Sequence, residues 1–196
     1  MLVTVLIAVV VLAVIGLYVI KYYNSLVDMQ QVLKQSEADV EVPLRRRLDL
    51  IPNIVGVVEG YVDHEHSTLV DVATARGSVE HDGLMDPRAQ TLMTGALGKL
   101  MALSEAYPAL RANESFQLLQ RELASTENDI AQARRTYNEA CAIYNTGRSV
   151  FPTVIVAAAF GFNKADFLDA DIGATQSLLV TPRVDFRSGR PMPTVA

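Results

Sequence analysis

The sequence contains no tryptophan and only one cysteine, and no stretch of it alternates polar and apolar residues. A single cysteine cannot form an intrachain disulfide and suits a reducing compartment. Without alternation, no pattern predicts a half-buried β-strand. The chain also lacks a basic surplus, since its formal net charge is −5. A general nucleic-acid binder normally carries a basic domain, so we expect no nucleic-acid partner.

The sequence motifs of common enzymes are missing as well. No glycine-rich phosphate loop follows a predicted strand, and no Gly-x-Ser-x-Gly elbow occurs. Cys141 has no histidine nearby in sequence that could raise its thiolate fraction, so a packed thiol is favoured over a nucleophile. We therefore expect a protein that is not an enzyme and that needs no cofactor.

A short segment, His64-Glu65-His66, contains residue types that bind metals. Zinc-binding histidines on a helix are four residues apart, so that both lie on one face. His64 and His66 are two apart and point to nearly opposite sides of a helix. A polar helical segment is the favoured interpretation, and no metal site is predicted.

The most hydrophobic part of the chain runs from Leu2 to Ile20 without a charged residue. As a helix rising ~1.5 Å per residue it spans roughly 28 Å, close to the hydrocarbon thickness of a bilayer. A cleaved signal peptide is the alternative, but no basic residue precedes the run and Lys21-Tyr22-Tyr23 follows it directly. Lysine and tyrosine suit a membrane interface, so we predict a transmembrane anchor at residues 1–22.

Positive charges near the anchor lie only on its C-terminal side, at Lys21, Lys34 and residues 45–47. The positive-inside rule then places the C-terminal domain of this single-pass protein in the cytoplasm and the N-terminus outside.

Beyond the anchor, apolar residues recur in steps of three and four. This spacing predicts a long helix that runs from the membrane past residue 62, bent or interrupted at Pro43 and Pro52. The first substantial loop is expected from Gly77 to Pro87, and a second helix before Pro108. A heptad pattern held for four repeats, from Phe116 to Tyr144, predicts a third helix. Asn113 is its expected N-cap and Gly147 its expected stop.

These elements predict an all-α fold, in which the transmembrane helix continues into a coiled-coil-like antiparallel bundle of long helices. The bundle domain is expected at residues 23–148, a short apolar or helical segment at 149–172, and an extended tail at 173–196. The apolar stretch from Val150 to Phe162 is too short to span a bilayer. It could be a core helix, a membrane-surface element or a contact between protomers.

Two sets of residues follow from this interpretation. The predicted core positions share the heptad spacing: they are Leu48, Ile51, Val55, Val58, Leu119, Leu123, Ile130 and Tyr137. The candidate interface positions are basic or apolar residues without an assigned burial site: they are Arg45, Arg46, Arg47, Val154, Ile155, Phe160 and Phe162. The three arginines fan over most of a helical turn, so they are expected off the apolar stripe. Ion pairs with Glu41 or Asp49 are the alternative to binding a lipid headgroup or a partner.

Several motifs, in order and spacing, resemble the LemA family of bacterial membrane proteins. They are RRRLDLIPNIV, GYVDHE, ARG, the stretch from YPALRANES to ACAIYN, and FP with FGF. The resemblance implies one N-terminal transmembrane helix in the bacterial inner membrane, a cytoplasmic helical bundle and no established enzymatic activity. The segment SEADVEVPL departs from the family pattern, because many members carry a tryptophan and glutamines before the arginines.

Three functions can be compared on these grounds. The first is a non-enzymatic membrane scaffold that contacts lipid and assembles into a homo-oligomer, since the heptad seams exceed what one small bundle needs. The second is an accessory subunit of another membrane protein, such as a protease or a signalling system. The third, an enzyme, has no supporting constellation of residues.

Overall fold

The computed structural model describes residues 1–62 and 66–168, and within these ranges the chain forms helices and no strand. The helices are α1 (Leu2–Glu59), α2 (His66–Asp82), α3 (Pro87–Ala106), α4 (Pro108–Arg111), α5 (Glu114–Ser149) and α6 (Thr153–Phe160). The predicted all-α fold is confirmed. The tail expected at 173–196 and the residues His64 and Glu65 lie outside the described residues.

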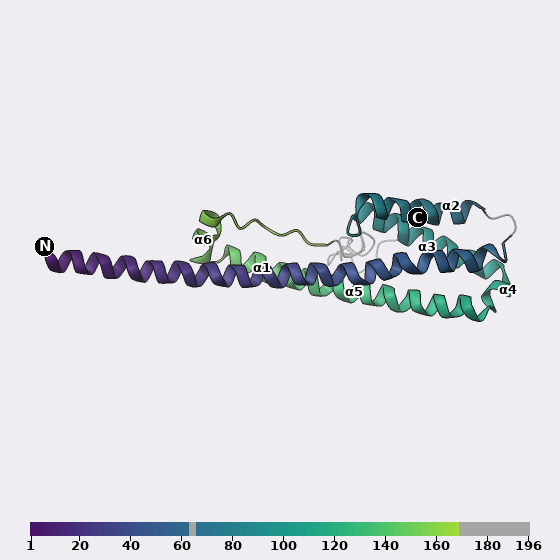
Figure 1. Ribbon diagram of the computed structural model, residues 1–196, viewed down its shortest axis with the longest axis horizontal. Helices are drawn as coiled ribbons and strands as arrows, with labels where there is room; N and C mark the ends of the chain where they lie inside the picture. The colour runs from purple at the N-terminus through teal and green to yellow at the C-terminus, as the bar shows by residue number, and fades with distance from the viewer. Residues whose placement is uncertain (63–65, 169–196) are drawn as a thin grey trace, which may run out of the picture.

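The first third of α1 projects alone beyond every other helix (Figure 1). It carries the apolar run, whose side chains are almost all exposed to their surroundings. By length and composition it is able to cross a membrane. The predicted continuation is confirmed too, because the same helix runs on into the bundle without a break.

The two prolines do not interrupt α1, where the sequence predicted either a bend or an interruption. Pro43 and Pro52 both lie inside the helix. Each removes the backbone donor for the carbonyl four residues earlier, which normally weakens a helix. Pro52 is exposed, so water can hydrate the carbonyl that it leaves unpaired. Packing along the rest of α1 then holds the helix together.

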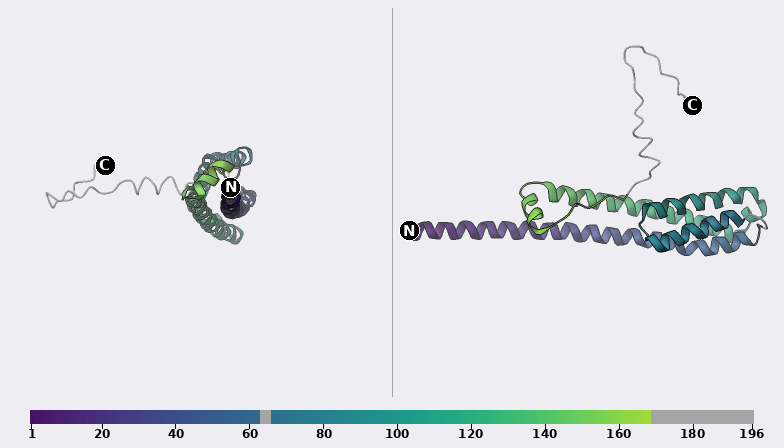
Figure 2. Two further views of the ribbon diagram at one scale, coloured as in Figure 1. Left: turned by 90° about the vertical axis from the view of Figure 1, so that its left-hand side faces the viewer. Right: turned by 90° about the horizontal axis from the view of Figure 1, so that it is seen from above.

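The body of the molecule is an antiparallel pair of long helices, α1 and α5 (Figure 1, Figure 2). Nearer the projecting end, the two helices bury a two-helix seam, which we call the stalk cluster. Its buried members are Leu33, Val40, Leu44, Ile130, Tyr137, Ala140, Cys141 and Tyr144. Farther along, α2 and α3 form a hairpin that packs against the pair and widens the core. This second core is the distal cluster, with Ile51, Val58, Met93, Leu100 and Phe116 among its buried residues.

The corner between α1 and α2 was not predicted. The seam suggested one helix past residue 62, but α1 ends at Glu59 and the chain turns at Gly60 and Tyr61. The expected loop from Gly77 to Pro87 is shorter than predicted, because α2 continues through Gly77 to Asp82. Only Gly83, which adopts a positive φ of 109°, and its neighbours make the turn. Asp86 then caps α3 by accepting from the N–H groups of Arg88 and Ala89.

The predicted core positions lie in or against the two clusters. Ile51, Val58, Leu123, Ile130 and Tyr137 are buried. Leu48, Val55 and Leu119 are half-buried and pack against the distal cluster. The stripe of α1 is broader here than a two-helix seam, because the distal cluster faces a hairpin as well as α5.

The sequence predicted the start of α5 correctly but not its end. Asn113 is the N-cap, since its side chain accepts from the N–H of Phe116. Gly147, expected to stop the helix, lies inside it, and α5 ends at Ser149. A larger residue at position 147 would collide with α1, because a Cβ there would lie 2.5 Å from the Met29 Sδ. It lets α1 and α5 approach each other closely at the projecting end of the stalk.

Candidate functional site

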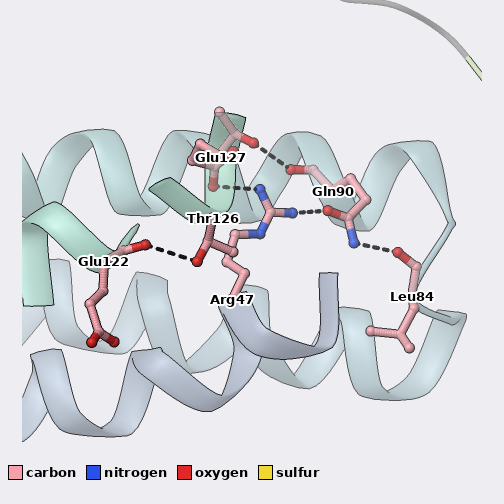
Figure 3. Close-up of polar contacts among 7 residues, drawn as sticks. Arg47, Leu84, Gln90, Glu122, Thr126 and Glu127 are labelled. Atoms are coloured by element: carbon pink, nitrogen blue, oxygen red, sulfur yellow. Dashed lines mark hydrogen bonds and ion pairs between the residues drawn. The ribbon is translucent and has the colours of Figure 1, made fainter. Parts of the chain in front are cut away.

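Arg47 is fully buried where the distal cluster meets the stalk cluster, with 2% of the residue exposed. Its Nη1 donates to Glu127 Oε1 at 2.9 Å, and its Nη2 donates to Gln90 Oε1. Gln90 in turn donates from Nε2 to the carbonyl of Leu84, in the turn between α2 and α3 (Figure 3). One guanidinium therefore joins α1, α3 and α5.

The pairing of Arg47 is incomplete. Its Nε has no hydrogen-bond partner among the described residues. The Glu127 side chain is 40% exposed, so this carboxylate keeps part of its hydration. Removing one partner of a buried charge pair costs about 3–5 kcal/mol, because the other charge stays buried and unpaired. Burying Arg47 therefore costs free energy unless its partners are in place. Its bond to Gln90 fixes the register at which α3 docks.

The expectation that all three arginines lie off the apolar stripe is wrong for Arg47. Arg45 and Arg46 are exposed, as the helical fan requires. Within the described residues, the ion pairs found do not join Arg45 or Arg46 to Glu41 or Asp49. The spacing held a signal for the buried arginine, because buried residues continue from Leu44 in steps of three and four. They are Leu44, Arg47, Ile51, Ile54 and Val58.

A second polar arrangement binds the chain after α6 to the surface of α5. Asn145 donates to the carbonyl of Ala165 at 2.8 Å and accepts from the N–H of the same residue at 3.0 Å. Asn138 makes the same pair of bonds with Leu168, at 2.9 Å each. We call residues 162–168 the strap. Figure 2 shows it running back from α6 along the stalk.

The two asparagines fit the strap because the distance between them along α5 nearly equals the distance between the strap residues that they bind. Seven helical residues separate Asn138 from Asn145, a rise of about 10.5 Å. Three extended residues separate Ala165 from Leu168, a span of about 10 Å. The strap therefore runs antiparallel to α5, with one peptide residue held by each asparagine.

Further contacts to the strap also reach its backbone. Tyr137 Oη donates to the carbonyl of Asp166 at 3.0 Å, and Tyr144 Oη donates to that of Asn163 at 2.9 Å. Arg148 Nε donates to the carbonyl of Phe162 at 2.9 Å. Because these bonds reach main-chain atoms, α5 recognises an extended backbone more than particular side chains.

Three ionisable side chains under the strap have raised pKa values, and burial is the main cause for each. Burial raises the pKa of Tyr137 above its ordinary 10.0, and the nearby charges of Cys141, Glu37 and Asp166 act in the same direction. Burial also raises the pKa of Tyr144. The pKa of the Cys141 thiol is raised by burial and by Asp166. A raised pKa leaves less thiolate at neutral pH, which does not favour nucleophilic chemistry at Cys141.

The apolar candidate interface forms the end of the bundle that faces the projecting segment. α6 packs Val156 and Ala157 against Leu26 of α1. The predicted residues Val154, Ile155 and Phe160 are 42%, 61% and 56% exposed. Phe162 is half-buried. The rings of Phe160 and Phe162 meet Tyr23 edge to face, at centroid distances of 5.0 and 5.7 Å.

A groove of about 320 Å³ lies between α3 and α5. Its lining is mostly apolar or small: Thr94, Leu97, Gly98 and Met101 from α3, with Gln120, Leu123, Ala124 and Glu127 from α5. One of these lining residues, Glu127, is also the partner of Arg47. Elsewhere in the described chain, no group of three or more His, Cys, Asp or Glu side chains could hold a metal ion. His66 begins α2.

Comparison with known proteins agrees with this architecture. The model of the LemA family matches residues 36–186, which is most of the chain. The chain belongs to the LemA family. The matched range starts within the stalk part of α1, after the apolar run, and takes in the distal cluster, α6 and the strap. The LemA-family match and the projecting apolar segment together indicate a membrane-associated helical protein.

Curated relatives of this LemA-family chain are magnetosome proteins. Magnetosome proteins MamQ 1 and MamQ 2 of Paramagnetospirillum magneticum are each 24% identical over 190 residues. Magnetosome protein MamQ of Magnetospirillum gryphiswaldense is similar to the same degree. Each alignment covers 83% of this chain and 70% of the relative.

Proposed function

We propose that this protein is a non-enzymatic membrane scaffold whose copies assemble side by side through their helical bundles. The groove between α3 and α5 carries the proposal. These two helices leave an apolar floor that includes Leu97 and Leu123 without closing over it. Gly98 at its edge allows close approach, since no atom lies within 4 Å of where its Cβ would be. A helix face of a second copy would cover this floor.

The anchor favours a second copy as the occupant. In the proposed topology α1 crosses the inner membrane with the N-terminus outside and the bundle in the cytoplasm, following the positive charges after Ile20. All copies then stand upright with their grooves at one height. Confinement to a plane raises the effective concentration of each copy for its neighbours, so a modest interface suffices.

The mass of the assembled protein tests this function. The full-length protein is extracted gently with its lipids, and its mass is measured by light scattering with the lipid contribution separated. We expect a discrete mass of several protomers. Gly98→Leu should reduce this mass by filling the groove. Gly77→Leu is the matched control, because Gly77 also lies exposed inside a helix with nothing within 4 Å.

Each result decides a separate point. A wild-type protein that is a monomer would overturn the scaffold. An assembly that Gly98→Leu leaves intact would overturn the groove as its contact. Co-purification of one copy with one different membrane protein would instead favour the accessory subunit.

A further inference from the structure

We propose that α6 lies in the headgroup layer of the membrane and inserts its outer face among the lipids, giving the bundle a second membrane contact beside the anchor. The first observation is the composition of α6. Its sequence, TVIVAAAF, holds no charged residue and one hydroxyl. A helix that is apolar on every side needs cover on every side.

The protein covers only one side of α6. Thr153, Val156 and Ala157 are buried, at the spacing of a single helical face. Large apolar side chains on and just before the helix remain exposed: they are Val150, Phe151, Val154, Ile155 and Phe160. Phe151 is 80% exposed. In water such a cluster is unfavourable, and its grouping at one end of the molecule marks an interaction surface.

The height of α6 identifies its partner. α6 and its flanks contact Tyr22, Tyr23 and Leu26 of α1. The apolar run ends at Ile20, so at ~1.5 Å per residue these contacts lie about 3–9 Å beyond the hydrocarbon. The headgroup layer on each side of a bilayer is about 5–7 Å thick. These contacts therefore reach from inside this layer to just beyond it, and α6 lies at the level where tyrosine and tryptophan side chains gather at a membrane interface.

The direction of α6 fits the same surface. Figure 2 shows α6 lying across the axis of α1 instead of along it. When α1 spans the membrane, α6 is then roughly parallel to the membrane plane, as in helices that lie on a bilayer. The aromatic cluster of Tyr23, Phe160 and Phe162 fixes α6 to α1 at this height.

The absence of tryptophan makes a direct test possible. A single Ile155→Trp substitution adds the only tryptophan to the full-length chain. The protein is reconstituted into phosphatidylcholine vesicles with and without bromine on the acyl chains, which quenches nearby tryptophan. Ile7→Trp, in the apolar run, is the control for membrane contact. Leu118→Trp, exposed at the far end of α5, is the control for a water-exposed site.

We expect brominated lipid to quench Ile155→Trp clearly, but less than Ile7→Trp, because the bromine lies on the acyl chains and α6 lies in the headgroup layer. Leu118→Trp should stay unquenched. Val154→Trp, one residue earlier on the same surface, should behave as Ile155→Trp. Quenching of both α6 variants no greater than that of Leu118→Trp, with Ile7→Trp quenched, would overturn the proposal. This includes the case in which a second copy of the chain covers α6. The result does not depend on whether copies assemble through the groove between α3 and α5. At a high ratio of lipid to protein the copies are separated, and α6 should still contact lipid.

Discussion

Asn138 and Leu168 exchange two hydrogen bonds at 2.9 Å, so a side chain of α5 pairs with a backbone residue of the strap as a neighbouring β-strand would. Asn145 repeats the pairing at Ala165. The strap is thereby fastened at two points, two helical turns apart. This relationship gives the first of four predictions.

Replacing both asparagines should release the strap. We expect Asn138→Ala with Asn145→Ala to abolish slow hydrogen exchange at the amides of Ala165 and Leu168, because both amides lose their acceptors. The loss of stability should be about 2–6 kcal/mol, since the two asparagines make four hydrogen bonds to the strap and each typically contributes about 0.5–1.5 kcal/mol. Asn128→Ala, on the exposed side of α5, is the control. Protected strap amides in the double variant would contradict the pairing.

The buried guanidinium predicts a ranking of three substitutions. Arg47→Ala should cost about 3–5 kcal/mol in urea unfolding, because it leaves a cavity and an unpaired Gln90. Arg47→Met should cost clearly less, because it fills the same volume and Glu127 is exposed enough to be hydrated. Arg46→Ala, one residue earlier and exposed, should stay within about 0.5 kcal/mol of the wild type. Equal effects of the Arg46 and Arg47 substitutions would remove the case for the buried site.

A charge inside the distal cluster should unfold it. Ile51 is 2% exposed, so Ile51→Asp buries an unpaired carboxylate and should cost several kcal/mol. Asn53→Asp places the same charge two residues on, at an exposed position, and should be tolerated. Thermal melting followed by circular dichroism distinguishes them. A wild-type melting curve for Ile51→Asp would mean that α1 buries a different face.

Alkaline conditions should loosen the stalk. The pKa values of Tyr137 and Tyr144 are raised above 10.0 in the folded protein, and that of Cys141 above 9.0. The unfolded chain therefore loses these protons first, and folding stability falls as the pH rises above about 9. Tyr137 must also stay protonated to donate to Asp166.

The measurement is urea unfolding at a series of pH values from 8 to 11, a range chosen around the ordinary values of these groups. The double variant Tyr137→Phe with Tyr144→Phe should begin less stable, because it lacks two hydrogen bonds, but it should lose less stability with rising pH. An identical slope in the double variant and the wild type would show that other groups cause the alkaline loss.

The regular parts of this fold could be predicted because their sequence pattern is periodic. The α5 seam from Phe116 to Tyr144 follows the heptad, and the structure buries most of it. The interruption considered at the two prolines does not occur, because local propensity is weaker than packing along a long helix. The loop expected to begin at Gly77 begins later for the same reason. Gly147 does not end its helix, and its close contact with Met29 depends on two helices that are distant in sequence.

The polar contacts could be predicted less well. Arg47 follows the apolar spacing, but its charge assigns it to the surface unless Glu127 and Gln90 are known to lie beside it. The strap has no period of its own, and Asn138 and Asn145 become meaningful only once an extended chain lies against α5. Such partners come together through tertiary structure, which one-dimensional spacing does not contain.

The continuity of α1 through both prolines sets a fixed reach for the protein. From Ile20 at the end of the apolar run to Val58 near the end of α1, the helix rises about 57 Å. No loop divides this length among the described residues, so if the apolar run spans a membrane, the far end of the bundle cannot fold down onto the lipid without breaking the helix. Whatever binds the groove between α3 and α5 must therefore meet it several nanometres from the end of the apolar run.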